Sequence, residues 1–175
     1  MKMLLTGVKD LDMKILNELD DVDLVKMCQT NRAADSICTD QSFWLNRIMT
    51  KFPYLSLEIL NKYKGDQKWS EYYINDLIKA LKEPGRYSMK GMEGRPDYFI
   101  ISLKNWPYDN VNLNELLVIV SIRGYLDIVR FLVSEGADIK YNSNSSVKYA
   151  YSKGHTDIVD YLVSQGAPDP RVHQL

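Results

Sequence analysis

An internal repeat with an offset of 30 residues constrains the fold of this chain more than any other feature of its sequence. The segments GYLDIVRFLVSEGAD, which begins at Gly124, and GHTDIVDYLVSQGAP, which begins at Gly154, are identical at nine of fifteen positions. Thirty residues before the first of them, Gly94 opens GRPDYFIISLKN, which shares the aspartate and the apolar run that follows it. The sequence therefore predicts three repeated units, the first of them degenerate.

Each unit has the periodicity of a helix. In the second copy the apolar residues fall on one helical stripe, namely Ile128, Val129, Leu132 and Val133. Asp127 stands in the first turn, where the helix dipole favours an acid, and Gly136 follows the last periodic residue, where a left-handed cap is expected. A second apolar stretch precedes each of these helices. We predict two helices and a polar connector such as YNSNSS per unit, and we expect the units to stack because none buries its apolar face alone.

These residues resemble ankyrin repeats. The string G-[YH]-x-D-I-V-x-[FY]-L-V-S-x-G-A is similar to the second helix and following turn of that family, and the resemblance covers residues 84–168. Two features depart from the family. The TPLH start of the first helix is absent, and the period is shorter than the usual ~33 residues, which indicates shortened hairpin fingers between Gly136 and Gly154. The resemblance implies a stack of helix pairs that binds a target protein.

Target recognition is expected to use the polar connectors and the exposed sides of the first helices, because stacking buries the apolar faces. Tyrosine flanked by asparagine suits this role, since it offers a large contact area at a low entropic cost. The same composition is also that of an ordinary turn-rich loop, and this alternative stays open. The candidate target-binding residues are Tyr108, Asp109, Asn110, Tyr141, Asn142 and Asn144.

The N-terminal third shows no such repeat and also has helical patterns. One helical face contains Leu11, Ile15, Leu16 and Leu19, and it ends at two aspartates. A second helix follows, for which Asp21 or Asp23 is the expected N-cap. A longer helix is predicted over residues 67–81, with aromatic and aliphatic residues at i, i+4 steps. No segment alternates as a strand does, so the predicted fold class is all-α.

Residues 5–50 resemble an F-box. The pattern I-L-x-x-L-D-x-x-D-L from Ile15 to Leu24, followed about twenty residues on by the pair Phe43-Trp44, is similar to that family's pattern. The leading Leu-Pro of the family is missing. A divergent F-box combined with ankyrin repeats is similar to the domain combination of proteins encoded by large DNA viruses. This resemblance would place the chain in the host cytoplasm. The predicted organisation is an F-box-like domain over 5–50, a helical linker over 51–83 and about three ankyrin repeats over 84–168.

The F-box resemblance implies docking on the Skp adaptor of a cullin ubiquitin ligase, while the repeats hold the target. Apolar burial at a few anchor residues would drive this docking. The alternative is an ankyrin scaffold without a ligase link, in which the N-terminal helices only cap the stack. The candidate adaptor-binding residues are Val8, Leu11, Ile15, Leu16, Leu19, Leu24 and Trp44.

Charge and composition disfavour other partners. The 22 basic and 23 acidic residues give a net charge of -1, which argues against nucleic acid or an anionic membrane surface as the main partner. No apolar run approaches the roughly 18 residues of a membrane span. We therefore expect protein partners only, and a chain that is monomeric on its own.

No catalytic or metal-binding constellation can be assembled from the sequence. His155 and His173 are the only histidines, and His155 occupies a repeat position at which ankyrin repeats often carry a structural histidine. Cys28 and Cys38 form no CxxC pattern, and we predict that both are reduced, buried and apolar in character, as in a cytosolic protein. The expectation is a protein that is not an enzyme and that binds no cofactor or metal.

Overall fold

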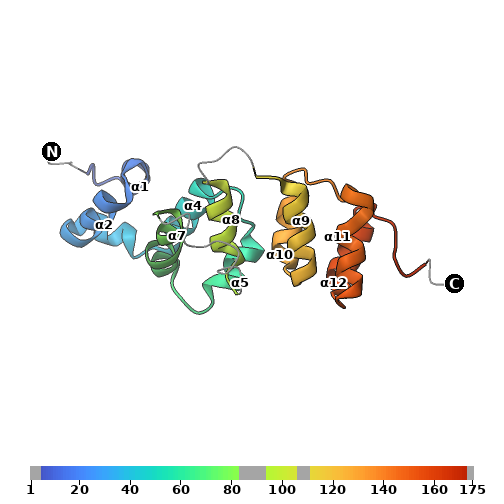
Figure 1. The fold of residues 1–175 in the computed structure, drawn as a ribbon. Coiled ribbons are helices and arrows are strands. Elements are labelled where there is room, and N and C mark those ends of the chain that lie inside the picture. Colours follow the sequence, from blue (N-terminus) through green and yellow to red (C-terminus); the bar gives the residue numbers. More distant parts are fainter. Residues whose placement is uncertain (1–4, 83–93, 106–110, 173–175) are drawn as a thin grey trace. The chain divides into compact units, whose positions relative to one another are not determined.

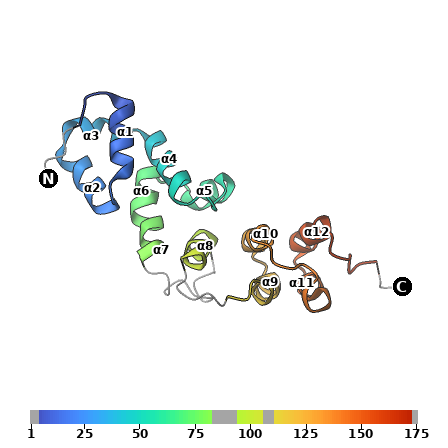
Figure 2. The ribbon, with the colours of Figure 1, turned by 90° about the horizontal axis from the view of Figure 1, so that it is seen from above.

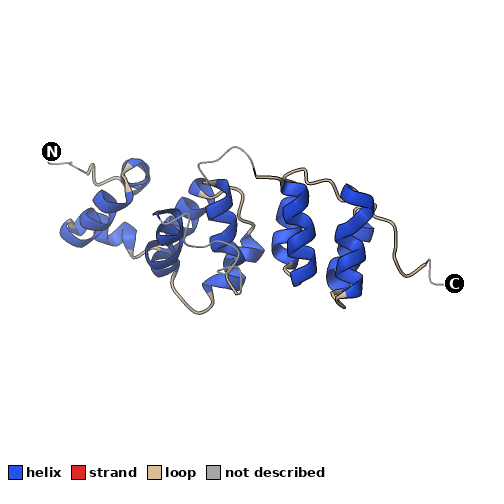
Figure 3. Ribbon diagram, viewed as in Figure 1, coloured by secondary structure: helices blue, strands red, loops and turns tan. Residues whose placement is uncertain are grey.

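The structure, a computed structural model, describes residues 5–82, 94–105 and 111–172. Within these ranges all regular elements are helices, so the predicted all-α class is confirmed (Figures 1 and 3). The chain divides into two compact units, Met1–Asn105 and Trp106–Leu175. The domain boundaries expected from the sequence, 5–50, 51–83 and 84–168, stay predictions.

The first unit is a set of short helices, several of which have a polar side chain as N-cap. Its elements are α1 (Lys9–Glu18), α2 (Asp21–Thr30), α3 (Arg32–Cys38), α4 (Gln41–Lys51), α5 (Leu57–Lys64), α6 (Trp69–Glu71), η1 (Tyr72–Leu77), α7 (Ile78–Lys82) and α8 (Pro96–Lys104). The side chain of Asp20 accepts from the backbone N–H of Asp23 at 2.8 Å and caps α2. The prediction that Asp21 or Asp23 caps this helix is therefore wrong, because the chain becomes helical one residue earlier than expected.

The helix predicted over 67–81 exists, but it contains a π-helical segment in its middle, η1. A π turn holds more residues than an α turn and shifts the faces that follow it. Two adjacent tyrosines at the start of η1, Tyr72 and Tyr73, are both buried, whereas Trp69 at the start of the predicted i, i+4 stripe is only half-buried. Helix α8 packs against α5, η1 and α7, and it begins with Pro96 in its first turn.

Cys28 and Cys38 form a disulfide in this structure, with their Cα atoms 5.8 Å apart. The prediction of two reduced cysteines is therefore wrong. Helices α2 and α3 meet at a single residue, Asn31, and pack against each other, which brings the two cysteines together. The spacing in the sequence did not indicate this fold-back. Because disulfides persist mainly in oxidising compartments, the cysteines give no support for the expected cytosolic location.

The second unit consists of two helix pairs, α9 (Leu113–Arg123) with α10 (Leu126–Ser134) and α11 (Tyr141–Ser152) with α12 (Thr156–Ser164). The members of each pair lie side by side, and α9 packs on α11 as α10 packs on α12 (Figure 2). The stacking expected from the repeat is thus confirmed within this unit. The glycines expected to end α10 and α12 have left-handed backbones, with φ of 91° at Gly136 and 98° at Gly166.

Burial follows the 30-residue register. Ile128, Val129 and Leu132 are fully buried, as are their equivalents in the last repeat, Ile158, Val159 and Leu162. The register breaks at Ser146, which is 0% exposed and stands where the preceding repeat has the buried Leu116. The Oγ of Ser146 has no hydrogen-bond partner within the described residues.

Replacing Ser146 by alanine is expected to stabilise the protein. A buried hydroxyl without a partner costs about 1 kcal/mol or more, and alanine removes that cost while leaving only a small void. Ser121→Ala is the matched control, because Ser121 is equally buried but its Oγ donates to the carbonyl oxygen of Leu117 at 2.7 Å. Thermal unfolding should show a higher Tm for Ser146→Ala only. Equal shifts in both variants would show that the hydroxyl of Ser146 has a hydrogen-bond partner.

Candidate protein-interaction surfaces

A buried arginine organises the N-terminal helices. Arg47 lies on α4 among Phe43, Trp44 and Ile48, and it is only 6% exposed. Its five N–H groups all donate. Nε donates to the hydroxyl of Tyr73, and the two terminal nitrogens donate to three carbonyl oxygens near the end of α1 and to one carboxylate. The sequence interpretation missed this residue, although a charged side chain at a position of the apolar stripe was a visible signal.

The carboxylate that Arg47 contacts belongs to Asp21, in the first turn of α2. Asp21 also accepts from the hydroxyl of Tyr73 at 2.5 Å and from the ammonium of Lys51 at 2.6 Å. Burial raises the pKa of Asp21, but the hydrogen bonds from Lys51, Tyr73 and Arg47 outweigh it and lower the pKa below its usual value. Burial and the bond to Asp21 raise the pKa of Tyr73. The four side chains therefore fix the end of α1 and the start of α2 to α4 and η1.

A second cluster of this kind links η1 to α8. The hydroxyl of Tyr72 donates to Asp97, which is fully buried, at 2.6 Å. The guanidinium of Arg95 binds the same carboxylate through Nε and Nη2 and reaches Asp76 through Nη1 at 3.0 Å. The hydroxyl of Tyr98 also donates to Asp76. Asp97 stands 30 residues before Asp127, the aspartate at the same position of the next repeat. In the structure, however, its hydrogen bonds lie within the first unit.

Three of the residues predicted to dock on an adaptor lie in the core of the first unit. Leu16 and Leu24 are 0% exposed and Trp44 is 2% exposed. The indole N–H of Trp44 donates to the carbonyl oxygen of Cys38 at 2.7 Å. These side chains hold the helices together and are not on the surface. The sequence pattern could not show this, because an apolar stripe serves core packing as readily as docking.

The remaining four predicted docking residues reach the surface to different degrees. Val8 is 54% exposed and Leu11 is 48% exposed, while Ile15 and Leu19 are half-buried. Leu11 and Ile15 are four residues apart on α1 and share one face, next to Val8 at its N-cap. The structure therefore presents a short apolar stripe of Val8, Leu11 and Ile15, which we call the α1 stripe.

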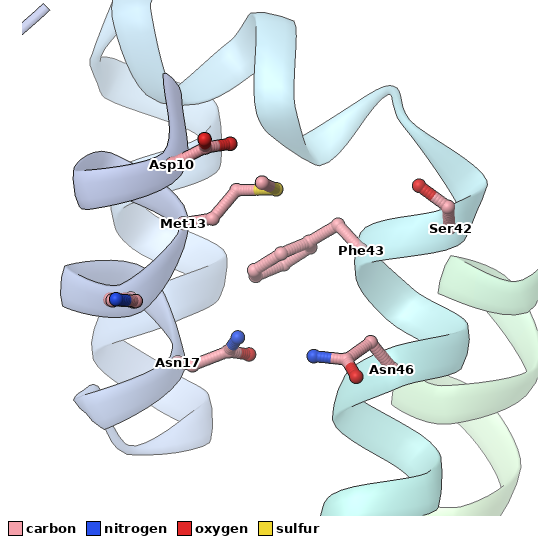
Figure 4. A pocket seen from close by; sticks show the side chains of 7 residues that line it. Asp10, Met13, Asn17, Ser42, Phe43 and Asn46 are labelled. Atoms are coloured by element: carbon pink, nitrogen blue, oxygen red, sulfur yellow. The ribbon is translucent and has the colours of Figure 1, made fainter. Parts of the chain in front are cut away.

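A groove of about 550 Å³ runs between another face of α1 and helix α4 (Figure 4). Met13 and Phe43 point toward each other across it, and the amides of Asn17 and Asn46 face each other at one end. Within the described residues, the buried Oδ1 of Asn17 has no hydrogen-bond partner. No feature of the sequence had indicated this groove. It separates the two helices on the side away from the α1 stripe.

The predicted target-binding residues are only partly described. Tyr108, Asp109 and Asn110 lie outside the described residues. Tyr141 and Asn144 are half-buried and Asn142 is exposed, all at the start of α11. The backbone from Asn142 to Asn144 is left-handed, with φ of 48°, 57° and 66° at its three residues. Such a run costs free energy in residues other than glycine, and it turns the side chains of Asn142 and Ser143 toward solvent.

The repeats contact each other through a histidine, as the structural assignment of His155 implied. Its Nε2 lies 3.0 Å from the carbonyl oxygen of Ile122 in the preceding repeat, which can only accept, so Nε2 donates. The same imidazole lies against Gly124, where a Cβ would come within 2.6 Å of the ring. A second contact ties α9 to the connector before α11, where the side-chain oxygen of Asn114 accepts from the backbone N–H of Asp138 at 2.7 Å.

The described residues contain no group of three or more His, Cys, Asp or Glu side chains placed to hold a metal ion. None of their helices combines the length and the apolar character that crossing a bilayer requires.

Comparison with known families matches residues 91–173 to a model described as Ankyrin repeats (3 copies). The C-terminal part of the chain therefore carries ankyrin repeats, as the resemblance of its residues implied. Ankyrin repeats are typically binding modules without enzymatic activity, and they imply protein partners. Comparisons with curated proteins and with solved structures gave no match.

Proposed function

We propose that this chain is a protein-interaction adaptor. Its ankyrin repeats hold a target protein, and its F-box-like N-terminal helices dock on the Skp adaptor of a cullin ubiquitin ligase. The observation that carries the docking half is the α1 stripe, in which Val8 and Leu11 stay about half exposed on a helix that is otherwise fixed by Arg47. The proposal implies action in the cytoplasm of a host cell.

The arrangement behind the stripe supports this function. Exposed apolar side chains on a rigid helix lose little entropy on binding and can act as anchors in a partner's groove. Arg47 and Asp21 fix the end of α1, and Asp12 fixes its beginning by accepting from the backbone N–H groups of Thr6 and Gly7. The stripe is thus held at both ends of its helix.

The test is capture of purified Skp adaptor by the full chain. We expect wild-type protein to capture it, and Val8→Asp combined with Leu11→Asp to abolish capture, because both changes place a charge in the proposed interface. Both side chains are exposed, so the fold should persist in circular dichroism. Val22→Asp is the matched control, since Val22 is an exposed valine on α2, 65% exposed and outside the stripe.

Wild-type protein that does not bind the adaptor would remove the ligase link. The chain would then be the ankyrin scaffold of the alternative interpretation, with N-terminal helices that only cap the stack. Loss of binding in Val22→Asp as well would show that surface charge, and not the stripe, controls capture.

A further inference from the structure

The solvent side of the first helices in the second unit is built from two different kinds of residue. Beyond the left-handed residues at the start of α11, its exposed side chains are Lys148, Tyr149 and Ser152, and Tyr149 is 48% exposed. Thirty residues earlier, at the same positions of α9, stand three half-buried aliphatic residues. Because α9 packs on α11 in register, these six residues lie on one side of the stack. We call this the first-helix face; its members are Val118, Ile119, Ile122, Lys148, Tyr149 and Ser152.

The aliphatic half of this face is unusual for a surface helix. Helix α9 has the sequence LNELLVIVSIR and is apolar on nearly all sides. A helix of that kind is normally covered on more than one face. Its inner residues, among them Leu117 and Val120, are fully buried, while Val118, Ile119 and Ile122 retain contact with solvent. Partly exposed aliphatic residues beside an exposed tyrosine form an apolar contact area.

The other half of the face is basic. Helix α11 contains no acidic residue, and Lys148 and its C-cap Lys153 are both exposed. Neither lysine has a carboxylate partner in the part of the chain that the structure describes. Arg123, the equivalent of Lys153 in the preceding repeat, is exposed as well, and the acid on the exposed side of α9, Glu115, lies two turns away toward the other end of the helix. Lys153 and Arg123 therefore extend the positive charge of Lys148 to the C-terminal ends of α11 and α9, at the edge of the first-helix face.

We propose that the first-helix face binds an acidic segment of the target protein that also carries aliphatic side chains. The aliphatic side chains would lie on Val118, Ile119 and Ile122, and the carboxylates would pair with Lys148 and Lys153. This inference rests on the proposed role of the repeats as the target-binding part. Packed helices are about 8–10 Å apart, so an extended segment that crosses both needs its aliphatic and acidic residues about three positions apart.

The probe for this surface is a fluorescein-labelled peptide of two leucines, two serines and three glutamates, titrated with the full chain in an anisotropy measurement. We expect saturable binding with a Kd on the order of 100 μM, because the face is small and the peptide is flexible. Lys148→Glu combined with Lys153→Glu should weaken binding at least about tenfold. Lys26→Glu combined with Lys79→Glu makes the same change of net charge at exposed sites of the first unit and should leave binding unchanged.

Three results would overturn the inference. The first is that the wild-type chain does not bind the peptide, and the second is that both double variants lose binding equally. The third is that the chain binds an oligothymidylate as tightly as the peptide, and that this binding depends equally on Lys148 and Lys153. Tyr149→Ala, which changes no charge, should also weaken peptide binding. Capture of the Skp adaptor is measured on the same preparations and should survive the Lys148 and Lys153 changes, so failure of this surface is distinguishable from failure of the adaptor proposal.

Discussion

Replacing Arg47 by methionine is expected to lower the free energy of unfolding by about 3–5 kcal/mol, the usual cost of removing one partner of a buried charge pair. Methionine is similar in volume and apolar, so the loss reports the missing hydrogen bonds and not a cavity. The carboxylate of Asp21 and three carbonyl oxygens near the end of α1 would lose a donor that they now share. Urea unfolding followed by tryptophan fluorescence measures this, since Trp44 is only 2% exposed and meets water when the helices unfold.

Lys51→Met is the matched control for Arg47→Met. Lys51 pairs with the same carboxylate, but its side chain is 31% exposed, so water screens this pair more than the Arg47 pair and we expect a loss of only about 1 kcal/mol. A loss in Lys51→Met as large as that in Arg47→Met would contradict the central role of Arg47.

The pH dependence of Arg47→Met provides a second test. Burial raises the pKa of Asp21, yet its hydrogen bonds outweigh this and hold the pKa below the unfolded value of about 4. A lowered folded pKa contributes stability above the unfolded pKa, and that stability is lost as the pH falls through the folded pKa. Arg47 is one of the causes of the lowering. The stability difference between wild type and Arg47→Met should therefore shrink below about pH 4.

Gly124→Ala is expected to destabilise the repeats by about 3 kcal/mol, from two separate costs. Gly124 has φ of 80°, in the left-handed region, where a residue with a Cβ loses about 1–2 kcal/mol. The new Cβ would also lie 2.6 Å from Cε1 of His155. The imidazole would have to move away and give up its hydrogen bond to Ile122, which costs about 1–3 kcal/mol if the carbonyl is left unpaired. Thermal unfolding of the full chain measures the sum.

The matched control is Gly154→Ala, one repeat later. Gly154 has nearly the same backbone, with φ of 78°, but a Cβ there meets no atom within 4 Å. This variant carries only the backbone cost, so the difference between the two variants isolates the contact between repeats. Equal losses would show that the His155 contact contributes nothing to the stability of the stack.

The apolar periodicity of the N-terminal helices predicted which residues are structurally important but not which are accessible. Leu11 and Leu16 belong to the same predicted face, yet Leu11 is 48% exposed and Leu16 is fully buried. The pattern specifies one side of a helix, whereas accessibility depends on how other helices, α3 among them, pack against that side. For this reason the predicted docking surface of seven residues reduces to the α1 stripe in the structure.

The sequence by itself determined the features that depend on nearby residues. The 30-residue register, the helix ends at Gly136 and Gly166 and the first-turn position of Pro96 all follow from local backbone preferences and from repetition. Only the tertiary structure decided the Cys28–Cys38 disulfide and the five hydrogen bonds of Arg47. Each of these depends on the distance between elements after folding, and that distance is set by how helices pack, which no single segment encodes.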